Sequence, residues 1–269
     1  MRRICLLIHR WLAIPFGLFF AIACFTGALL LWKNEVAALM GQDAGTSDFF
    51  RGVTRFHRWL FMPPANPHGG MSTGRLVMGM TAIAATLILL TGVAVWWPRS
   101  LRQLKSRLAV HIGRGFRRFI YDSHVSLGIY ATVFLLLMSL TGPVWSFSGY
   151  RRAAVALIGG SETRSSGHGR PAQVPPAARS IGGQHQGKGR PAGEQRAAAP
   201  AQAGSHAAQA HGQRGANSPQ RTFIYLHTGK WGGTAGQVIY TLATVVGGFL
   251  PISGYWLWWV RRRRLVCRR

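Results

Sequence analysis

The chain has 269 residues, of which 48% are hydrophobic and 14% charged, and its formal net charge is +26. The charge does not indicate a nucleic-acid-binding protein, because the basic residues flank long apolar blocks and form no stripe interleaved with aromatic side chains. Only six residues are acidic, which argues against a paired-carboxylate site or an acidic ion pathway, and no phosphate-binding glycine loop or GxSxG elbow is present.

Four apolar blocks predict four transmembrane helices, at about 11–32, 75–97, 125–147 and 235–260. Each block has about 20 residues or more, the length that a helix needs to cross about 30 Å of hydrocarbon. The first block runs to Trp32 without a break, which is too long for the apolar part of a signal peptide, so we expect it to remain as a helix. The predicted fold class is an all-α, integral membrane four-helix bundle.

The distribution of basic residues predicts the orientation of the bundle. Basic residues precede the first block, separate the second from the third and follow the fourth, so all three regions lie on one side of a four-span protein. The positive-inside rule makes that side cytoplasmic. The loop between the third and fourth blocks is also basic, but long loops are translocated largely regardless of charge. We therefore expect both termini to be cytoplasmic.

The composition also predicts how the chain is divided. The segment 160–222 is rich in Ala, Gly, Gln, Pro, Arg and Ser without apolar periodicity, so it is predicted to be a disordered external loop. The basic segment after the second block is expected to be either a helix on the inner membrane surface or a solvated loop. The predicted parts are a first transmembrane hairpin (1–98), a basic cytoplasmic loop (99–123), a third transmembrane helix (124–159), the disordered loop (160–222), and a fourth helix with a basic tail (223–269).

The two halves of the chain repeat a pattern of His, hydroxyl and Gly residues. His9 stands 17 residues before Thr26-Gly27, and His124 stands 17 residues before Thr141-Gly142. The hydroxyl–glycine pairs are interpreted as packing features, since Gly lets helices approach and the hydroxyl can bond to its own helix. The spacing predicts that the bundle is built from two repeated helical hairpins.

The second and fourth blocks repeat a pattern of their own. Thr91-Gly92 and Ser253-Gly254 are each followed by aromatic and then basic residues, and His57 and His227 stand just upstream of these blocks. Each hairpin therefore has one His at the start of its first helix and one before its second.

Topology places these histidines in two pairs. His9 and His124 share the cytoplasmic face, and His57 and His227 share the outer face. Two neutral imidazoles on facing helices can hold a haem iron from both sides, and ionisable residues at membrane depth are usually functional. The four histidines therefore predict two haems, one near each face, unless each is merely an interfacial His solvated at a helix end.

The other histidines are weaker candidates. His111 could replace His124 as a ligand, although it has no repeat partner, and His68 is expected in a turn. Four histidines in the predicted disordered loop could bind metal loosely, but their spacing is irregular. They are His168, His185, His206 and His211.

The four blocks resemble the helices of the PepSY-associated transmembrane family of bacterial inner-membrane proteins. The resemblance rests on HRWLAIPFGLFFAIACFTGALLLWKNEV, on FHRWLF with GRLVMGMTAIAATLILLTGVAVWWPR, on SHVSLGIYATVFLLLMSLTG, and on LHTGKWGGTAGQVIYTLATVVGGFLPISGYWLWWVRRRR. It implies an inner-membrane location, haem b, and four haem-iron ligands, namely His9, His57, His124 and His227. The family includes ferric-siderophore reductases, so it also implies an oxidoreductase that sends electrons outward to ferric iron on a periplasmic siderophore.

The chain departs from that family in one respect. Family members often carry folded PepSY domains in their external loops, whereas here the first external loop is short and the second is predicted to be disordered. A periplasmic siderophore-handling partner is therefore expected.

Three functions remain open at this point. The first is an electron carrier that contains haem b and takes electrons from a cytoplasmic donor or from quinol, since the chain has no nicotinamide- or flavin-binding domain. The second is a non-redox partner or regulatory protein of an iron or metal uptake system. The third is a metal-handling protein that uses the histidines of the external loop. In each case the lipid bilayer is a partner and nucleic acid is not.

Overall fold

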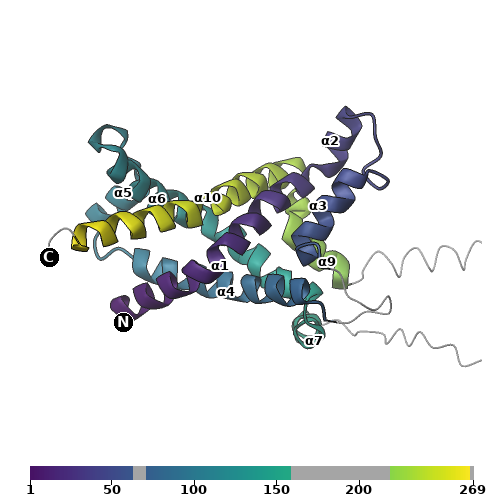
Figure 1. Ribbon diagram of the computed structural model, residues 1–269, viewed down its shortest axis with the longest axis horizontal. Helices are drawn as coiled ribbons and strands as arrows, with labels where there is room; N and C mark the ends of the chain where they lie inside the picture. Colours follow the sequence, from purple (N-terminus) through teal and green to yellow (C-terminus); the bar gives the residue numbers. More distant parts are fainter. Residues whose placement is uncertain (63–70, 159–218, 267–269) are drawn as a thin grey trace, which may run out of the picture.

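The computed structural model describes residues 1–62, 71–158 and 219–266, with side chains up to residue 263, and within these ranges the chain is helical and has no strand. Four helices are long and apolar enough to cross a membrane: α1 (Arg2–Leu31), α4 (Thr73–Trp96), α6 (Phe116–Thr141) and α10 (Gly233–Val266) (Figure 1). Each contains all or most of one of the four apolar blocks. The all-α fold class and the four helices that it requires are confirmed.

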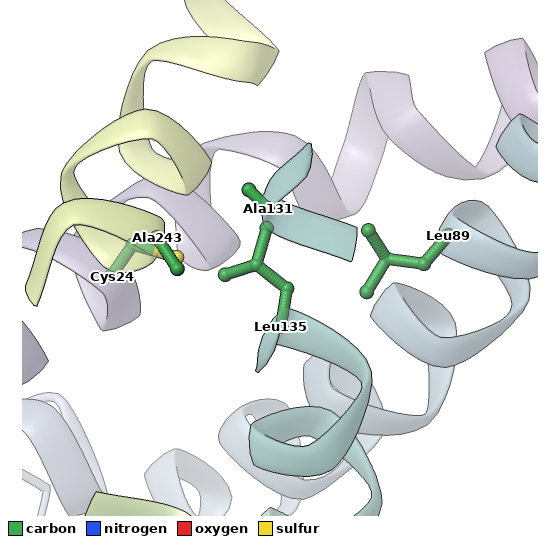
Figure 2. Close-up of a cluster of buried hydrophobic side chains, with 5 residues drawn as sticks. All are labelled: Cys24, Leu89, Ala131, Leu135 and Ala243. Carbon is green, nitrogen blue, oxygen red and sulfur yellow. The ribbon is translucent and has the colours of Figure 1, made fainter. Parts of the chain in front are cut away.

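The four long helices pack in a ring. α1 contacts α4 and α10, and α6 contacts the same two helices. Helices α1 and α4 form the first hairpin and α6 and α10 the second, which confirms the predicted pair of hairpins. The centre of the ring is filled by small and branched side chains from all four helices, which point toward one another in Figure 2: Cys24, Leu89, Ala131, Leu135 and Ala243.

Glycines let α10 approach its neighbours closely. A Cβ atom at Gly247 would lie 3.0 Å from Sγ of Cys24, and one at Gly248 would lie 2.6 Å from the ring of Phe25. Polar side chains reinforce the same contact, since Trp32 donates its Nε1–H to Oγ1 of Thr241 over 2.7 Å. The first helix is thus held against the last by close packing and by a hydrogen bond of the kind that joins helices in membranes.

The outside of the ring is apolar. Large side chains that project from the four spans are between a third and two thirds exposed, and none of them is charged: Leu18, Leu87, Leu90, Val133, Leu140, Leu242 and Phe249. Such a surface is stable in lipid and unstable in water. The protein is therefore a membrane protein, and lipid covers the outside of the bundle.

Shorter helices lie at the two ends of the bundle (Figure 1). We call the end that carries Arg2 and Arg263 the terminal end and the opposite end the loop end. The terminal end carries α5 (Leu101–Leu108) and the single turn η1 (Ile112–Arg114). The loop end carries α2 (Lys33–Leu39), α3 (Asp48–Trp59), η2 (Gly142–Trp145), α7 (Ser148–Leu157), α9 (Pro219–Thr228) and η3 (Lys230–Gly232).

Some boundaries differ from those predicted. The third span begins at Phe116, earlier than the apolar block, because Arg117 and Arg118 lie in its first turn and mask its hydropathy. Residues 160–218 of the predicted disordered loop lie outside the described residues, and residues 219–222 are helical as the start of α9. The basic loop contains the short helix α5; its position on the membrane surface stays a prediction.

A buried carboxylate ties the basic loop to α6. Asp122 is 4% exposed and accepts hydrogen bonds from Nδ1 of His111 at 2.9 Å and from Nε of Arg118 at 2.9 Å. One turn later, Ser126 donates its hydroxyl to the carbonyl oxygen of Leu108 over 2.6 Å. These bonds fix the loop next to the start of the helix that carries His124.

Candidate functional site

The loop end holds two histidines in matching surroundings. His57, in the last turn of α3, lies with its Nδ1 atom 2.8 Å from Oγ1 of Thr26 on α1. His227, in the last turn of α9, lies with its Nδ1 atom 2.8 Å from Oγ1 of Thr141 on α6. Each short helix thus places its His against the end of the first long helix of its own hairpin.

The terminal end repeats this arrangement with the second long helix of each hairpin. His9 on α1 lies with its Nδ1 atom 2.8 Å from the carbonyl oxygen of Ile88 and 3.4 Å from Oγ1 of Thr91 on α4. His124 on α6 lies with its Nδ1 atom 2.8 Å from Oγ of Ser253 on α10. All four histidines therefore meet the hydroxyl of a Thr-Gly or Ser-Gly pair. We call these four groups the anchor hydroxyls: Thr26, Thr91, Thr141 and Ser253.

The anchor hydroxyls determine which ring nitrogen carries the proton. Thr26 donates its own hydroxyl proton to the carbonyl oxygen of Ile22 over 2.6 Å, so its oxygen is left to accept from the Nδ1–H of His57. The other three hydroxyls likewise donate to carbonyl oxygens of their own helices, at 2.7 Å for Thr91, 2.7 Å for Thr141 and 2.9 Å for Ser253. In each imidazole the Nε2 atom then keeps its lone pair, which is the form that binds metals.

The glycine after the hydroxyl has no side chain and so leaves room for the imidazole ring. A Cβ atom on Gly27 would lie 3.4 Å from Cε1 of His57, and one on Gly92 would lie 3.3 Å from Cε1 of His9. The corresponding distance from Gly254 to Cε1 of His124 is 3.5 Å. At the fourth position, Gly142 faces Ala82 and not the imidazole, so this function of glycine applies to three of the four sites.

The histidines form two pairs, and each pair takes one member from each hairpin. His57 and His227 lie within electrostatic range of each other at the loop end, and His9 and His124 do so at the terminal end. We call them the loop-end pair and the terminal-end pair. The structure thus brings together the residues that the sequence assigned to common faces.

The loop-end pair is kept uncharged. Burial lowers the pKa of His57 to about 4, and the neighbouring His227 adds to this effect. Burial also lowers the pKa of His227 to about 4. Both imidazoles are therefore neutral at pH 7 and able to donate an electron pair to a metal ion.

Among the described residues, one further histidine lies apart from these pairs. His111 is bound through Nδ1 to Asp122, separately from the terminal-end pair. Among the described residues no group of three or more His, Cys, Asp or Glu side chains is placed to hold a metal ion. The weaker candidates that the sequence suggested fall outside the described residues, namely His68, His168, His185, His206 and His211.

Sequence reasoning did not identify the anchor hydroxyls as part of the site. It interpreted them as packing features that bond to their own helix, and they do make those bonds. Their second contact, to a histidine, depends on helix rotation, which spacing does not reveal. One feature of the sequence could have indicated the contact, because the chain has four hydroxyl–glycine pairs and four span-end histidines in the same repeat.

The comparisons with known proteins point to one family. The sequence model of a family described as "PepSY-associated TM region" matches residues 6–47 and 37–261, which together cover most of the chain. No curated protein and no solved structure matches the chain.

Proposed function

The chain belongs to the family of PepSY-associated transmembrane regions, and on that premise we propose that it is a transmembrane electron carrier that contains two haem b groups. The observation that carries the proposal is the pairing of four imidazoles, each with its Nδ1 atom anchored and its Nε2 atom free. His9 and His124 would hold one haem, and His57 and His227 the other.

The donor set fits haem iron. Neutral imidazole is a common ligand of haem iron in proteins. A hydrogen bond from Nδ1–H to an oxygen atom orients a ligating imidazole and raises its basicity. At the loop end the low pKa of both rings removes competition from protons at neutral pH. Haem would supply a one-electron couple between its ferric and ferrous states.

Two histidine pairs at opposite ends of the bundle are suited to hold haems that pass electrons across the membrane. The core between them is apolar, with Cys24 and Leu135 buried at its centre, and it would keep water and ions from crossing with the electron. The proposed direction is from the cytoplasmic side, or from quinol, to a periplasmic acceptor in a bacterial inner membrane. This direction follows from the positive-inside rule.

We propose ferric iron, free or bound to a siderophore, as the acceptor, which would make the protein an oxidoreductase of the ferric-reductase type. The support is the resemblance of the four helices to the PepSY-associated transmembrane family, which includes ferric-siderophore reductases. Reduction to the ferrous state weakens binding by the hard oxygen ligands of a siderophore. A periplasmic partner would present the siderophore to the loop end.

The deciding experiment is a dithionite-reduced minus oxidised absorption spectrum of the protein purified in detergent after expression with ample haem. Sharp b-type bands and about two haems per chain are expected. A flat spectrum would refute the proposal and favour a non-redox partner of an iron or metal uptake system. Metal binding that disappears when residues 160–222 are deleted, with no haem, would favour the metal-handling function.

A further inference from the structure

Two arginines lie together beside the loop-end pair. Arg58 follows His57 in the last turn of α3, and Arg75 lies in the first turn of α4. A Cβ atom on Gly74 would overlap the carbonyl oxygen of Trp59, so the backbones of the two helices touch at this point. The contact brings Arg58 within electrostatic range of Arg75.

Within the described part of the chain, their contacts leave both positive charges without a carboxylate. Arg75 donates its Nε–H to the carbonyl oxygen of Trp145 over 3.0 Å, and its terminal nitrogens have no hydrogen-bond partner among the described residues. Arg58 lies over the ring of Trp59, at 5.2 Å from its centroid. The ion pairs found among the described residues are Arg51–Asp48, His111–Asp122 and Arg118–Asp122, so they include neither arginine.

Placing these two charges together is unfavourable in the protein as it stands. Arg58 and Arg75 carry charges of the same sign within electrostatic range, so they repel each other. Arg58 gains from the negative end of the α3 dipole, but Arg75 lies at the positive end of α4, where a cation is disfavoured. The helix dipole therefore does not explain why a cation lies at position 75. An anion between the two guanidinium groups would remove their repulsion.

The contacts of Arg75 also lead to the histidines. The carbonyl group that orients Arg75 belongs to Trp145, and the ring of Trp145 packs edge-on against the ring of His227, with centroids 5.3 Å apart. One arginine thus adjoins His57 in sequence and the other reaches His227 through a single residue. An anion bound by both would lie next to a group held by the loop-end pair.

We propose that Arg58 and Arg75 bind the propionate carboxylates of the haem held by His57 and His227. The inference rests on the proposed function. Haem b carries two propionates, and a guanidinium group binds a carboxylate through two parallel hydrogen bonds. The sequence repeats one part of this arrangement, because His57-Arg58-Trp59-Leu60 recurs as His9-Arg10-Trp11-Leu12, so that His9 of the terminal-end pair is also followed by an arginine.

The test compares haem with its dimethyl ester, in which both propionates are uncharged. Full-length apoprotein with His9→Ala and His124→Ala, so that only the loop-end pair remains, is titrated with each compound. We expect haem to bind more tightly than the ester by about tenfold or more. Arg58→Gln and Arg75→Gln are each expected to reduce this preference, whereas Arg75→Lys, which keeps the charge, should retain most of it.

Arg55→Gln is the matched control. Arg55 lies one turn before Arg58 on α3, is exposed, and should leave the preference unchanged. If the preference for haem persists in both Gln variants, the inference is refuted while the proposed function stands, since haem still binds. If the preference persists but reduction of an anionic ferric chelate slows, the arginines bind the acceptor, which also refutes the inference. If no variant binds either compound, the proposed function fails.

Discussion

Nδ1 of His57 and Oγ1 of Thr26 lie 2.8 Å apart although 31 residues separate them, and the contact between His227 and Thr141 has the same length across 86 residues. Two connecting segments of different length therefore place a histidine against the equivalent threonine of two repeated helices. Because the two contacts have the same length, we infer that the hydrogen bond to the hydroxyl, and not the connecting segment, determines the orientation of each imidazole ring.

Removing an anchor hydroxyl should weaken the ligand without removing it. Thr26→Val is expected to lower haem affinity at the loop end by about 10–100-fold, the usual effect of losing a group that orients a metal ligand. Thr26→Ser should restore most of the affinity. Thr132→Val is the control, because Thr132 donates to Gly128 of its own helix and contacts no histidine. Haem titration gives the affinities, and equal values for Thr26→Val and Thr132→Val would contradict the assignment.

Single histidine variants should each remove one haem. His57→Ala is expected to lower the haem content from about two to about one per chain, and His227→Ala should do the same. The double variant should be no lower than either single variant, because both residues serve one site. His111→Ala, whose ring is bound to Asp122, should keep both haems. Loss of both haems from a single variant, measured by absorbance, would show that the two sites are not independent.

The glycines beside the imidazoles should resist substitution. Gly92→Ala places a Cβ atom 3.3 Å from Cε1 of His9, so the ring must give by a small amount and haem should bind less tightly at the terminal end. Gly74→Ala meets the backbone of Trp59, which cannot move aside, and should cost about 1–3 kcal/mol of stability. Gly52→Ala has no atom within 4 Å and is the control for both. Haem titration and thermal unfolding in detergent distinguish the two effects.

The apoprotein should lose stability in mild acid. In the unfolded chain a histidine binds a proton near pH 6.5, whereas His57 and His227 bind one only near pH 4 when folded. Between these values the unfolded state holds more protons, so stability falls as the pH falls from about 6.5 to about 4 and these two residues contribute no further loss below that. Thermal unfolding of His57→Gln/His227→Gln should depend less on pH in this window; an unchanged dependence would assign it to other groups.

Loss of the buried carboxylate should release the basic loop. Asp122→Asn removes the negative partner of His111 and Arg118, so residues 109–115 should separate from α6 more often. Limited trypsin digestion should then cut several-fold faster after Arg114. Glu35→Gln, an exposed change on α2, should leave the rate unaltered. An unchanged rate in Asp122→Asn would mean that Ser126 and its bond to Leu108 suffice to hold the loop.

Hydropathy and spacing predicted the architecture because both depend on position along the chain alone. The apolar blocks are long enough to require spanning helices, and the repeated distance from His9 to Thr26 and from His124 to Thr141 identified the two hairpins. Hydropathy missed the start of α6 and the short helices at the loop end, among them α3 and α9. The first turn of α6 contains Arg117 and Arg118, which hydropathy counts against a span although they can reach the membrane surface.

The chemistry of the site was harder to predict because it depends on rotation about helix axes. The sequence shows that Thr26 precedes a glycine, but not that its oxygen faces α3. It shows Arg58 and Arg75 in separate segments, and only the contact of Gly74 with Trp59 brings them together. Composition could not identify these two arginines either, since the chain has 32 lysines and arginines and these two do not differ from the rest in type.

The division of each histidine pair between two hairpins has a consequence for biosynthesis. The ribosome makes His9 first and His124 much later, so the terminal-end pair is complete once α6 has been made. The loop-end pair is incomplete until His227, which precedes the last span, has been synthesised. The chain thus acquires its two pairs in a set order, and a nascent chain released before α9 has at most one. The pair at the loop end is complete only after synthesis has passed α9.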